Sequence, residues 1–501
     1  MAAPRPSLVP ALRSTLLALA VTLAPGAEAQ SIALRTVPVA TGDQFLVQPS
    51  RNLGIGGVSI ALDDPWLDPF LNPALGGEIG RSTFLTSPTF YGVEHDSGAG
   101  RTIPLTGLFR GRKWFAGASV ALQQIVDQNG GGPCCWAVRP EMALIDIAFP
   151  PSVDGTDATN TYASGYVGRR LGERWTVGVG GSAAQLNAVD GVDLLYANAQ
   201  AIEQDGHAWD VRAGATAELG EGRRLEAALV YSRFAMEHDV TYLEWRWDQS
   251  VRVMQPTVRV EENLDRTNSS GFHTVFTAPV GERWRAGTVL TVNRKSHPRI
   301  PNYDLANIPR DPGDSWAFNL GAGLGHERGP LRFGVDVVYE PVWSETWAEA
   351  ADTVRTTGGV LLQPGDHTVE NDFFLSNLHL RLGLGRETRR WGFQLGLRAS
   401  ARETELEQWN VLTAARREQE ESWMEWTPSL GAVVKFPEVE VRYAGWITTG
   451  TGMPSVSFGV RGDRAVAAES AADFLVAPAG PLVLQEAHVT SHQITVRLPL
   501  D

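Results

Sequence analysis

Few residues of this chain have the types and spacing that chemistry requires. The two cysteines, Cys134 and Cys135, are adjacent and lie in a Gly-Gly-Gly-Pro-Cys-Cys-Trp segment that predicts a loop. A strained disulfide between them is the chemical alternative, whereas a metal site would need histidines nearby. The ten histidines show no H-E-x-x-H spacing, and no G-x-S-x-G motif occurs. We therefore expect no enzyme, no metal site and no cofactor.

A cluster of glycines, Gly54, Gly56 and Gly57, is the other candidate for chemistry. It lacks the third-glycine spacing of a dinucleotide-binding loop and has no buried strand before it, so we set that interpretation aside. Composition excludes further classes. A formal net charge of −14 argues against nucleic-acid binding, and 43% hydrophobic residues argue against disorder. The body of the chain contains none of the apolar runs of about 20 residues that transmembrane helices need.

The first 29 residues resemble a secretory signal peptide. Arg5 and Arg13 supply the positive start, an apolar stretch covers residues 16–23, and Ala-Glu-Ala at residues 27–29 forms an A-x-A cleavage site. The apolar stretch is too short for a retained membrane anchor. We therefore expect residues 1–29 to be removed and the mature chain to be exported.

The rest of the chain is dominated by alternation of apolar with polar or small residues. Leu331, Phe333, Val335 and Val337 would share one face of a strand, opposite Arg332, Gly334 and Asp336. The same alternation occurs at residues 378–384, 391–400 and 493–498. A period of two indicates strands with one apolar and one polar side.

Soluble sandwiches also alternate, so other features must decide between them and a membrane barrel. Charged residues such as Arg332, Asp336 and Arg381 lie deep within the polar faces, where a wet lumen would tolerate them. The strands reach the length of about 9–11 residues that membrane crossing needs. Short and long connections also alternate, which is typical of outer-membrane barrels.

The connections predict the number of strands. Short polar turns are expected at residues 109–114, 171–175, 219–223, 280–284, 325–330, 385–391 and 436–438. Long irregular segments are expected at 127–158, 188–206, 238–265, 297–313, 346–369, 405–421 and 450–488. Seven hairpins, a first strand near residues 81–91 and a last near 492–500 give about sixteen strands.

Tryptophans follow four of the short turns directly. An indole has one polar and one apolar edge and therefore prefers the headgroup level of a membrane. We predict that these residues form the inner aromatic girdle, although four ordinary core tryptophans would show the same spacing: Trp114, Trp175, Trp284 and Trp391.

Residues 30–80 do not alternate and are rich in glycine and proline. They contain an Arg-x-x-Gly-x-Gly-Gly stretch, an Ala-Leu-Asp-Asp run and an Asn-Pro-Ala triplet. This order, ahead of a long barrel, resembles the FadL/OMPP1 superfamily of fatty-acid and toluene channels, which includes PorV/PorQ-like proteins. The matching residues are Arg51, Gly54, Gly56, Gly57, Ala61, Leu62, Asp63, Asp64, Asn72, Pro73 and Ala74.

The resemblance implies that residues 30–80 fold into the lumen as a hatch and that the barrel has fourteen strands. The glycines would let the backbone pack closely against the wall. Asp63 and Asp64 could pair with lumen arginines such as Arg332, Arg381 or Arg398. The alternative is that the motif only nucleates the inner edge of the barrel.

The sequence thus predicts an all-β protein: a transmembrane antiparallel barrel of 14–16 strands over residues 81–501, with an N-terminal hatch, in the outer membrane of a Gram-negative-type bacterium. The resemblance implies a channel for hydrophobic small molecules of the long-chain fatty-acid or aromatic type. The alternative is a PorV-like barrel for protein secretion or surface attachment. Expected partners are outer-membrane lipid, a hydrophobic ligand, the barrel-assembly machinery and, in the alternative, secretion-system proteins.

Overall fold

The computed structural model describes residues 35, 38–94, 98–126, 157–189, 201–248, 253–297, 301–302, 313–350, 352–454 and 484–500. The expected signal peptide and the Cys134–Cys135 pair lie outside these ranges, so the predictions made for them stay predictions.

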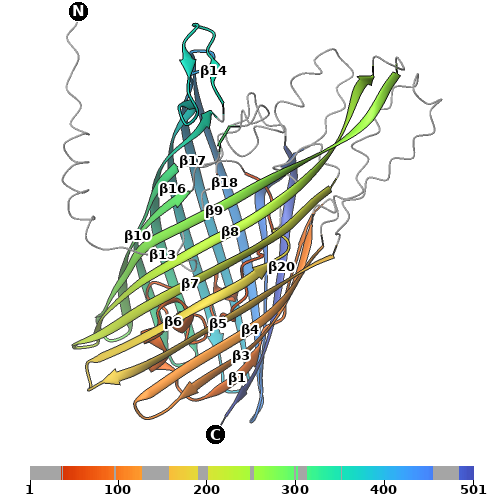
Figure 1. Ribbon diagram of the computed structural model, residues 1–501. Helices are drawn as coiled ribbons and strands as arrows, with labels where there is room; N and C mark the ends of the chain where they lie inside the picture. The colour runs from red at the N-terminus through yellow and green to blue at the C-terminus, as the bar shows by residue number, and fades with distance from the viewer. Residues whose placement is uncertain are drawn as a thin grey trace, which may run out of the picture.

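Long antiparallel strands dominate the described chain, and three short helical turns precede them (Figure 1). The turns are η2 (Leu53–Ile55), α2 (Asp68–Leu71) and η3 (Pro73–Glu78). The strands are β1 (Thr83–Thr86), β2 (Thr89–Val93), β3 (Ala99–Arg110), β4 (Trp114–Val126), β5 (Asp157–Leu171), β6 (Trp175–Leu186), β7 (Ala201–Gly220), β8 (Arg223–Asp248), β9 (Val253–Val280), β10 (Trp284–His297), β11 (Pro301–Asn302), β12 (Gly313–Arg328), β13 (Leu331–Ala350), β14 (Val354–Arg355), β15 (Leu361–Leu362), β16 (His367–Glu387), β17 (Trp391–Asn410), β18 (Ala415–Lys435), β19 (Glu440–Pro454) and β20 (Leu484–Pro499).

The strands close into a barrel. Each long strand pairs with its neighbour in the chain, and β20 returns to pair with both β1 and β2. β1 and β2 form one interrupted strand. Both also pair with β3, and only Ser87 and Pro88 lie between Thr86, the last residue of β1, and Thr89, the first residue of β2. Over the described residues the wall therefore has sixteen strands. The count from the turns is confirmed, and the fourteen implied by the resemblance is wrong.

All seven short turns lie where the sequence predicts them, at the lower end of the barrel in Figure 1. Two of the long segments differ from expectation. Residues 238–265 and 405–421 are largely continuations of the hairpins β8–β9 and β17–β18. In the β17 part of these extensions the exposed face is acidic, at Glu403, Glu405 and Glu407, whereas Leu406 on the opposite face is buried. Their polarity resembles that of a loop although their backbone remains paired.

The outer surface of the wall is apolar. In β13, Leu331, Val337 and Tyr339 are 40%, 43% and 39% exposed, whereas Arg332 and Asp336 are 2% and 0% exposed. Every one of the sixteen wall strands carries at least one exposed large apolar side chain within the described residues. Soluble monomers rarely expose apolar surface on this scale. A closed, long-stranded barrel with such a surface is an outer-membrane β-barrel.

The four turn-following tryptophans begin β4, β6, β10 and β17 and are exposed on the outer surface at the short-turn end. Their contact with lipid headgroups remains a prediction. Among the described residues, no helix is both long and apolar enough to cross a membrane.

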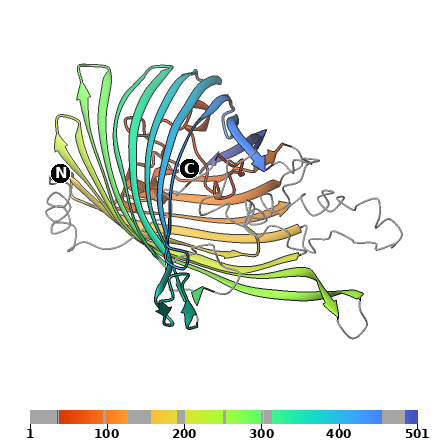
Figure 2. The same cartoon turned by 90° about the horizontal axis from the view of Figure 1, so that it is seen from above.

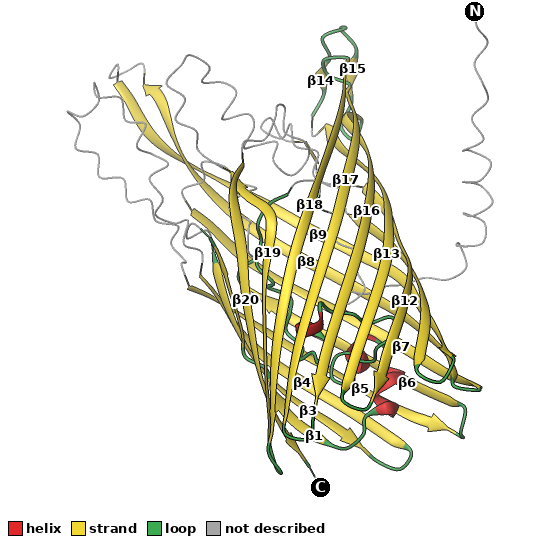
Figure 3. Cartoon of the chain, turned by 180° about the vertical axis from the view of Figure 1, so that it is seen from behind, coloured by secondary structure: helices red, strands yellow, loops and turns green. Residues whose placement is uncertain are grey.

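Residues 38–80 lie inside the barrel. Seen from above, this orange-to-red segment is surrounded by the strands (Figure 2). Its helical turns lie in the lower part of the barrel, toward the short turns (Figure 3). We call residues 38–80 the hatch.

The hatch packs on a band of wall glycines. Register places Gly325 of β12 opposite Gly334 of β13, Gly334 opposite Gly383 of β16, and Gly383 opposite Gly396 of β17. A Cβ at Gly325 would lie 2.5 Å from the carbonyl oxygen of Ala61, and one at Gly396 would collide with the backbone nitrogen of Gly56. Glycine is therefore required for the main chain of the hatch to rest directly on the wall.

We predict that Gly396→Ala loosens the hatch. The added methyl group must displace backbone, which costs about 1–3 kcal/mol. Trypsin cleavage after Arg51 in the folded barrel should then become about tenfold faster, because cleavage follows the population of the open form. Gly92→Ala is the control, since a Cβ at Gly92 meets nothing within 4 Å. Equal cleavage rates in the two variants would contradict the close approach.

Candidate functional site: the hatch and its contacts with the lumen wall

The first part of the hatch is a closed loop organised by Asp64. This carboxylate is buried and accepts hydrogen bonds from the hydroxyl of Ser50 (2.6 Å) and from the backbone N–H groups of Arg51 (2.7 Å) and Asn52 (3.2 Å). The Asn52 amide closes the loop by donating to the carbonyl oxygens of Val58 (2.9 Å) and Leu62 (3.2 Å). Asp64 therefore shapes the hatch itself. Among the described residues no ion pair joins it to a lumen arginine, so the predicted pairing of Asp64 is wrong.

Asp63 ties this loop to the wall. Its two carboxylate oxygens accept from Nη2 (2.7 Å) and Nη1 (2.8 Å) of Arg285 on β10, and Oδ1 also accepts from Nη2 of Arg224 on β8 (2.7 Å). Arg224 also pairs with Glu78 of the hatch (2.5 Å) and Glu226 of β8 (2.6 Å). Asp63 thus pairs with lumen arginines, as expected, but these are Arg285 and Arg224 and not the named Arg332, Arg381 or Arg398. We call these three residues the Asp63 clamp.

The clamp holds Asp63 ionised. Burial favours its protonated form, but the hydrogen bonds and positive charges of Arg285 and Arg224 outweigh burial and lower the pKa of Asp63 to about 2. The nearby Asp68 behaves in the opposite way. Burial, reinforced by the charges of Asp64 and Asp63, raises the pKa of Asp68 well above its usual value.

The predicted lumen arginines contact the hatch differently. Arg332 donates to the side-chain oxygen of Asn52 (3.0 Å) and the main-chain oxygen of Asp63 (3.2 Å). Arg381 donates to the hydroxyl of Ser59 (3.3 Å). Among the described residues, no ion pair joins Arg332, Arg381 or Arg398 to Asp63 or Asp64.

Asp336 of β13 provides a further polar contact. Its buried carboxylate accepts from the backbone N–H groups of Ser59 (2.7 Å) and Ile60 (3.2 Å). The wall thus satisfies main-chain donors of the hatch that lie away from water, as buried N–H groups require.

The glycine cluster spans η2, which contains Gly54, and the turn after it, which contains Gly56 and Gly57. Gly56 and Gly57 both have φ of +72°, a left-handed conformation that glycine adopts without strain. The N–H of Gly56 donates to the hydroxyl of Ser429 on β18 (3.1 Å). Gly54 lies against Gln394, whose amide donates to the carbonyl oxygen of Arg51 (3.4 Å).

The Asn-Pro-Ala triplet begins η3. The side chain of Asn72 accepts from the N–H of Ala74 (3.2 Å), and Pro73 occupies the first position of the helical turn. Two lumen arginines hold the flanking main chain. Arg212 of β7 donates to the carbonyl oxygen of Phe70, and Arg170 of β5 donates to that of Gly77.

The lumen wall nearer the long connections carries two apolar patches. One joins Leu186 of β6, Ala208 of β7 and Met236 of β8, with Tyr162, Ala184, Val189 and Phe234 packed against it. The other joins Ala317 of β12, Val342 of β13 and Leu375 of β16, with Phe373 beside it. These side chains share the inward strand faces with the buried polar residues of the wall. A barrel lumen is normally polar, so the patches are unusual.

Several residues of this arrangement carry no distinct sequence signal. Arg224 and Arg285 are two of many arginines on alternating strands, and only the three-dimensional register brings them to Asp63. Asn52 and Ser50 flank the motif arginine Arg51. Their position beside the glycine-rich stretch is the one feature of the sequence that indicates a structural role for them. Within the described ranges, no group of three or more His, Cys, Asp and Glu side chains could hold a metal ion.

Comparisons with known proteins concern architecture. No family model matches the chain, and no curated protein matches it in sequence. Among solved structures, a FadL homologue of Pseudomonas aeruginosa is 12% identical, covers 93% of this chain and 100% of its own, and has a TM-score of 0.42. The CymD monoaromatic hydrocarbon channel is 10% identical, with 92% and 99% coverage and a TM-score of 0.40. The Ralstonia pickettii toluene transporter TbuX is 10% identical, with 93% and 100% coverage and a TM-score of 0.37. The chain is similar to these barrels in general architecture.

We predict that Asp63→Asn increases opening of the barrel. Loss of the charge weakens the bonds to Arg285 and Arg224, each worth about 1.5–3 kcal/mol when one partner is ionised. Single-channel recording in planar bilayers should show openings about tenfold more frequent. Asp314→Asn is the matched control, because Asp314 also pairs with an arginine (Arg294, 3.0 Å) but outside the hatch. Unchanged opening in Asp63→Asn would show that the clamp does not restrain the hatch.

The clamp also predicts a dependence on pH. Because the pKa of Asp63 is lowered to about 2 from the ordinary 3.8, its contribution is complete above about pH 4 and is lost as pH falls toward 2. We expect the difference in opening frequency between the wild-type chain and Asp63→Asn to persist at pH 5 and to be lost as the pH falls through 2. A difference that disappears above pH 5 would contradict the clamped ion pair.

Proposed function

We propose that this protein is an outer-membrane channel that admits hydrophobic small molecules of the fatty-acid or aromatic type. The observation that carries the proposal is the pair of apolar lumen patches, centred on Leu186 and Met236 on one side and on Val342 and Leu375 on the other. Their central side chains are buried (Leu186 and Val342 are 0% exposed, Met236 and Leu375 1%). An apolar solute would therefore reach these clusters only when neighbouring segments move aside, and would then find the contacts that a water-filled pore denies it.

The hatch supports a gated channel over a general diffusion pore. Porin barrels of 16–18 strands leave an aqueous channel unless something fills it. Here Trp66, Phe70 and Ile79 of the hatch pack with Leu108 of β3 and Tyr166 of β5, and Phe70 and Tyr166 meet edge to face with their ring centroids 5.2 Å apart. A solute that passes the apolar patches therefore meets a packed segment, and transport needs this segment to shift.

A second candidate is a barrel that docks secreted or surface proteins without moving a solute. Acidic residues that face outward near the long connections, on β13, β16, β17 and β18, favour this second candidate. Register places the exposed side chains of Glu345, Asp372, Glu407 and Glu418 directly opposite one another on four adjacent strands. Arg416 pairs with Glu407 (2.9 Å) and Glu418 (3.1 Å) and offsets part of this charge. The acidic surface as a whole suits a basic partner. Capture of a secretion-system protein by the mature chain, without any solute uptake, would favour this candidate.

We predict that Met236→Glu lowers solute uptake. A carboxylate in the apolar patch raises the cost of passage, and we expect uptake to fall by about tenfold or more. The measurement is uptake of radiolabelled toluene and hexadecanoate by cells whose only added channel is this protein. Met236→Leu is the control because it keeps volume and polarity, and gel shift on heating checks that each barrel is folded. The channel proposal fails if neither solute enters faster than in cells without the protein.

A further inference from the structure

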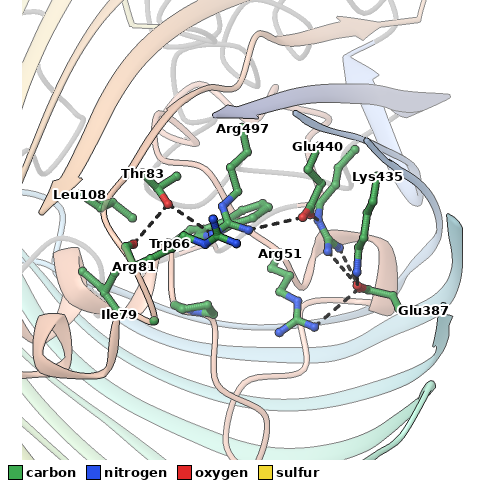
Figure 4. A pocket seen from close by; sticks show the side chains of 13 residues that line it. Arg51, Trp66, Ile79, Arg81, Thr83, Leu108, Glu387, Lys435, Glu440 and Arg497 are labelled. Carbon is green, nitrogen blue, oxygen red and sulfur yellow. Dashed lines mark hydrogen bonds and ion pairs between the residues drawn. The ribbon is translucent and has the colours of Figure 1, made fainter. Parts of the chain in front are cut away.

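A cavity of about 290 Å³ lies between the hatch and the wall at the short-turn end of the barrel (Figure 4). Hatch residues Arg51, Trp66 and Ile79 line one side. The other side comes from the ends of β1, β3, β16, β18, β19 and β20. Short turns of outer-membrane barrels face the periplasm, so this cavity lies at the inner mouth of the lumen.

The cavity has more positive than negative charge. Two carboxylates line it, Glu387 and Glu440, against five cations: Arg51, Arg81, Lys435, Arg442 and Arg497. Among the residues that line the cavity, cations therefore outnumber carboxylates by three. Glu327 behind the cavity does not change this balance, because it pairs with Arg332 (3.0 Å) as well as with Arg51 (3.4 Å).

The two carboxylates are already engaged by cations. Glu387 pairs with Arg442 (2.9 Å), Lys435 (2.8 Å) and, more loosely, Arg51 (3.7 Å). Glu440 pairs with Arg442 and with Arg497 (3.4 Å).

Arg81 and Arg497 carry most of the remaining charge. Among the described residues, Arg81 has no ion-pair partner. Arg497 donates from Nη1 to Glu440 (3.4 Å) and from Nη2 to the Thr83 hydroxyl (3.3 Å), which leaves its Nε without a partner among those residues. An anion in the cavity would therefore meet donors that the protein's own carboxylates leave available.

The cavity also has an apolar wall. Trp66, Ile79 and Leu108 line it and are buried, and Pro65 completes this side. The guanidinium carbons of Arg442 and Arg497 lie 5.2 and 5.9 Å from the centroid of the Trp66 ring. An apolar body and a cationic rim thus occupy one small space. The volume is at the lower end of the range of about 300–1,000 Å³ for ligand pockets, which selects a compact ligand.

We propose that this cavity binds compact organic carboxylates, with the carboxylate against Arg81 and Arg497 and the apolar body against Trp66, Ile79 and Leu108. Arginine guanidinium groups bind carboxylates through paired hydrogen bonds, and an aromatic or short-chain body fits the apolar wall. The site deepens the proposed function by naming a solute class that the inner mouth would hold before release. Its existence as a binding site does not require that transport occurs.

Isothermal titration of the folded mature chain in detergent micelles at low salt tests the site. The probes are benzoate, its neutral analogue benzyl alcohol, and inorganic phosphate. We expect benzoate to bind, benzyl alcohol to bind at least tenfold more weakly, and phosphate to bind more weakly than benzoate because it has no apolar body. Benzoate affinity should fall by about tenfold or more in the double variant Arg81→Gln/Arg497→Gln.

Arg389→Gln is the matched control, since Arg389 is an exposed arginine in a turn at the same end of the barrel that does not line the cavity. The proposal is overturned if the wild-type chain does not bind benzoate, or if the double variant, folded by gel shift on heating, binds it like the control. Phosphate that binds as tightly as benzoate would overturn the role of the apolar wall. Because the titration measures no uptake, its failure leaves the channel proposal standing, and failure of uptake leaves the site standing.

Discussion

Direct packing of the hatch main chain on the glycine band determines which other apolar and polar contacts can form between the hatch and the wall. Without side chains at Gly334, Gly383 and Gly396, the hatch comes close enough for Ile55, Val58 and Leu62 to form a buried apolar cluster against the wall. The same approach brings short polar side chains within reach of wall arginines. Larger residues in the band would hold the hatch away, and these contacts would be lost together.

Charge in the lumen follows from this closeness. A buried ionised group is tolerated when a partner of opposite charge or several hydrogen bonds compensate for lost hydration. Arg224, Arg285 and Asp336 all find such partners on the hatch or beside it. The hatch therefore supplies partners for charged residues on the inward strand faces. These are the same charged faces that, in the sequence, favour a barrel over a soluble sandwich. Toward the long connections, two apolar clusters share the inward strand faces with buried polar residues.

The wall could be predicted from the sequence because its signals are local. Alternation over ten residues, a glycine-bearing turn and a tryptophan directly after it, as at Trp114 and Trp391, each depend on near neighbours in the chain. The contacts of the hatch could not be predicted in this way. Asp63 pairs with arginines 161 and 222 residues away, and which of the inward arginines it meets depends on where every intervening strand lies. The extensions at 238–265 and 405–421 were missed because their many charged and polar residues resemble those of a loop.

The most direct test of the seated hatch is a disulfide between hatch and wall. A Cβ at Gly334 would lie 2.5 Å from Cγ1 of Val58, and its nearest neighbours are side-chain atoms that can adjust. In a chain with Cys134 and Cys135 replaced by serine, Val58→Cys and Gly334→Cys should form a disulfide in outer membranes, detected by mass spectrometry. The pair Val58→Cys and Val337→Cys should not, because Val337 faces outward. No link at position 334, or equal linking at both positions, would contradict a hatch seated on the glycine band.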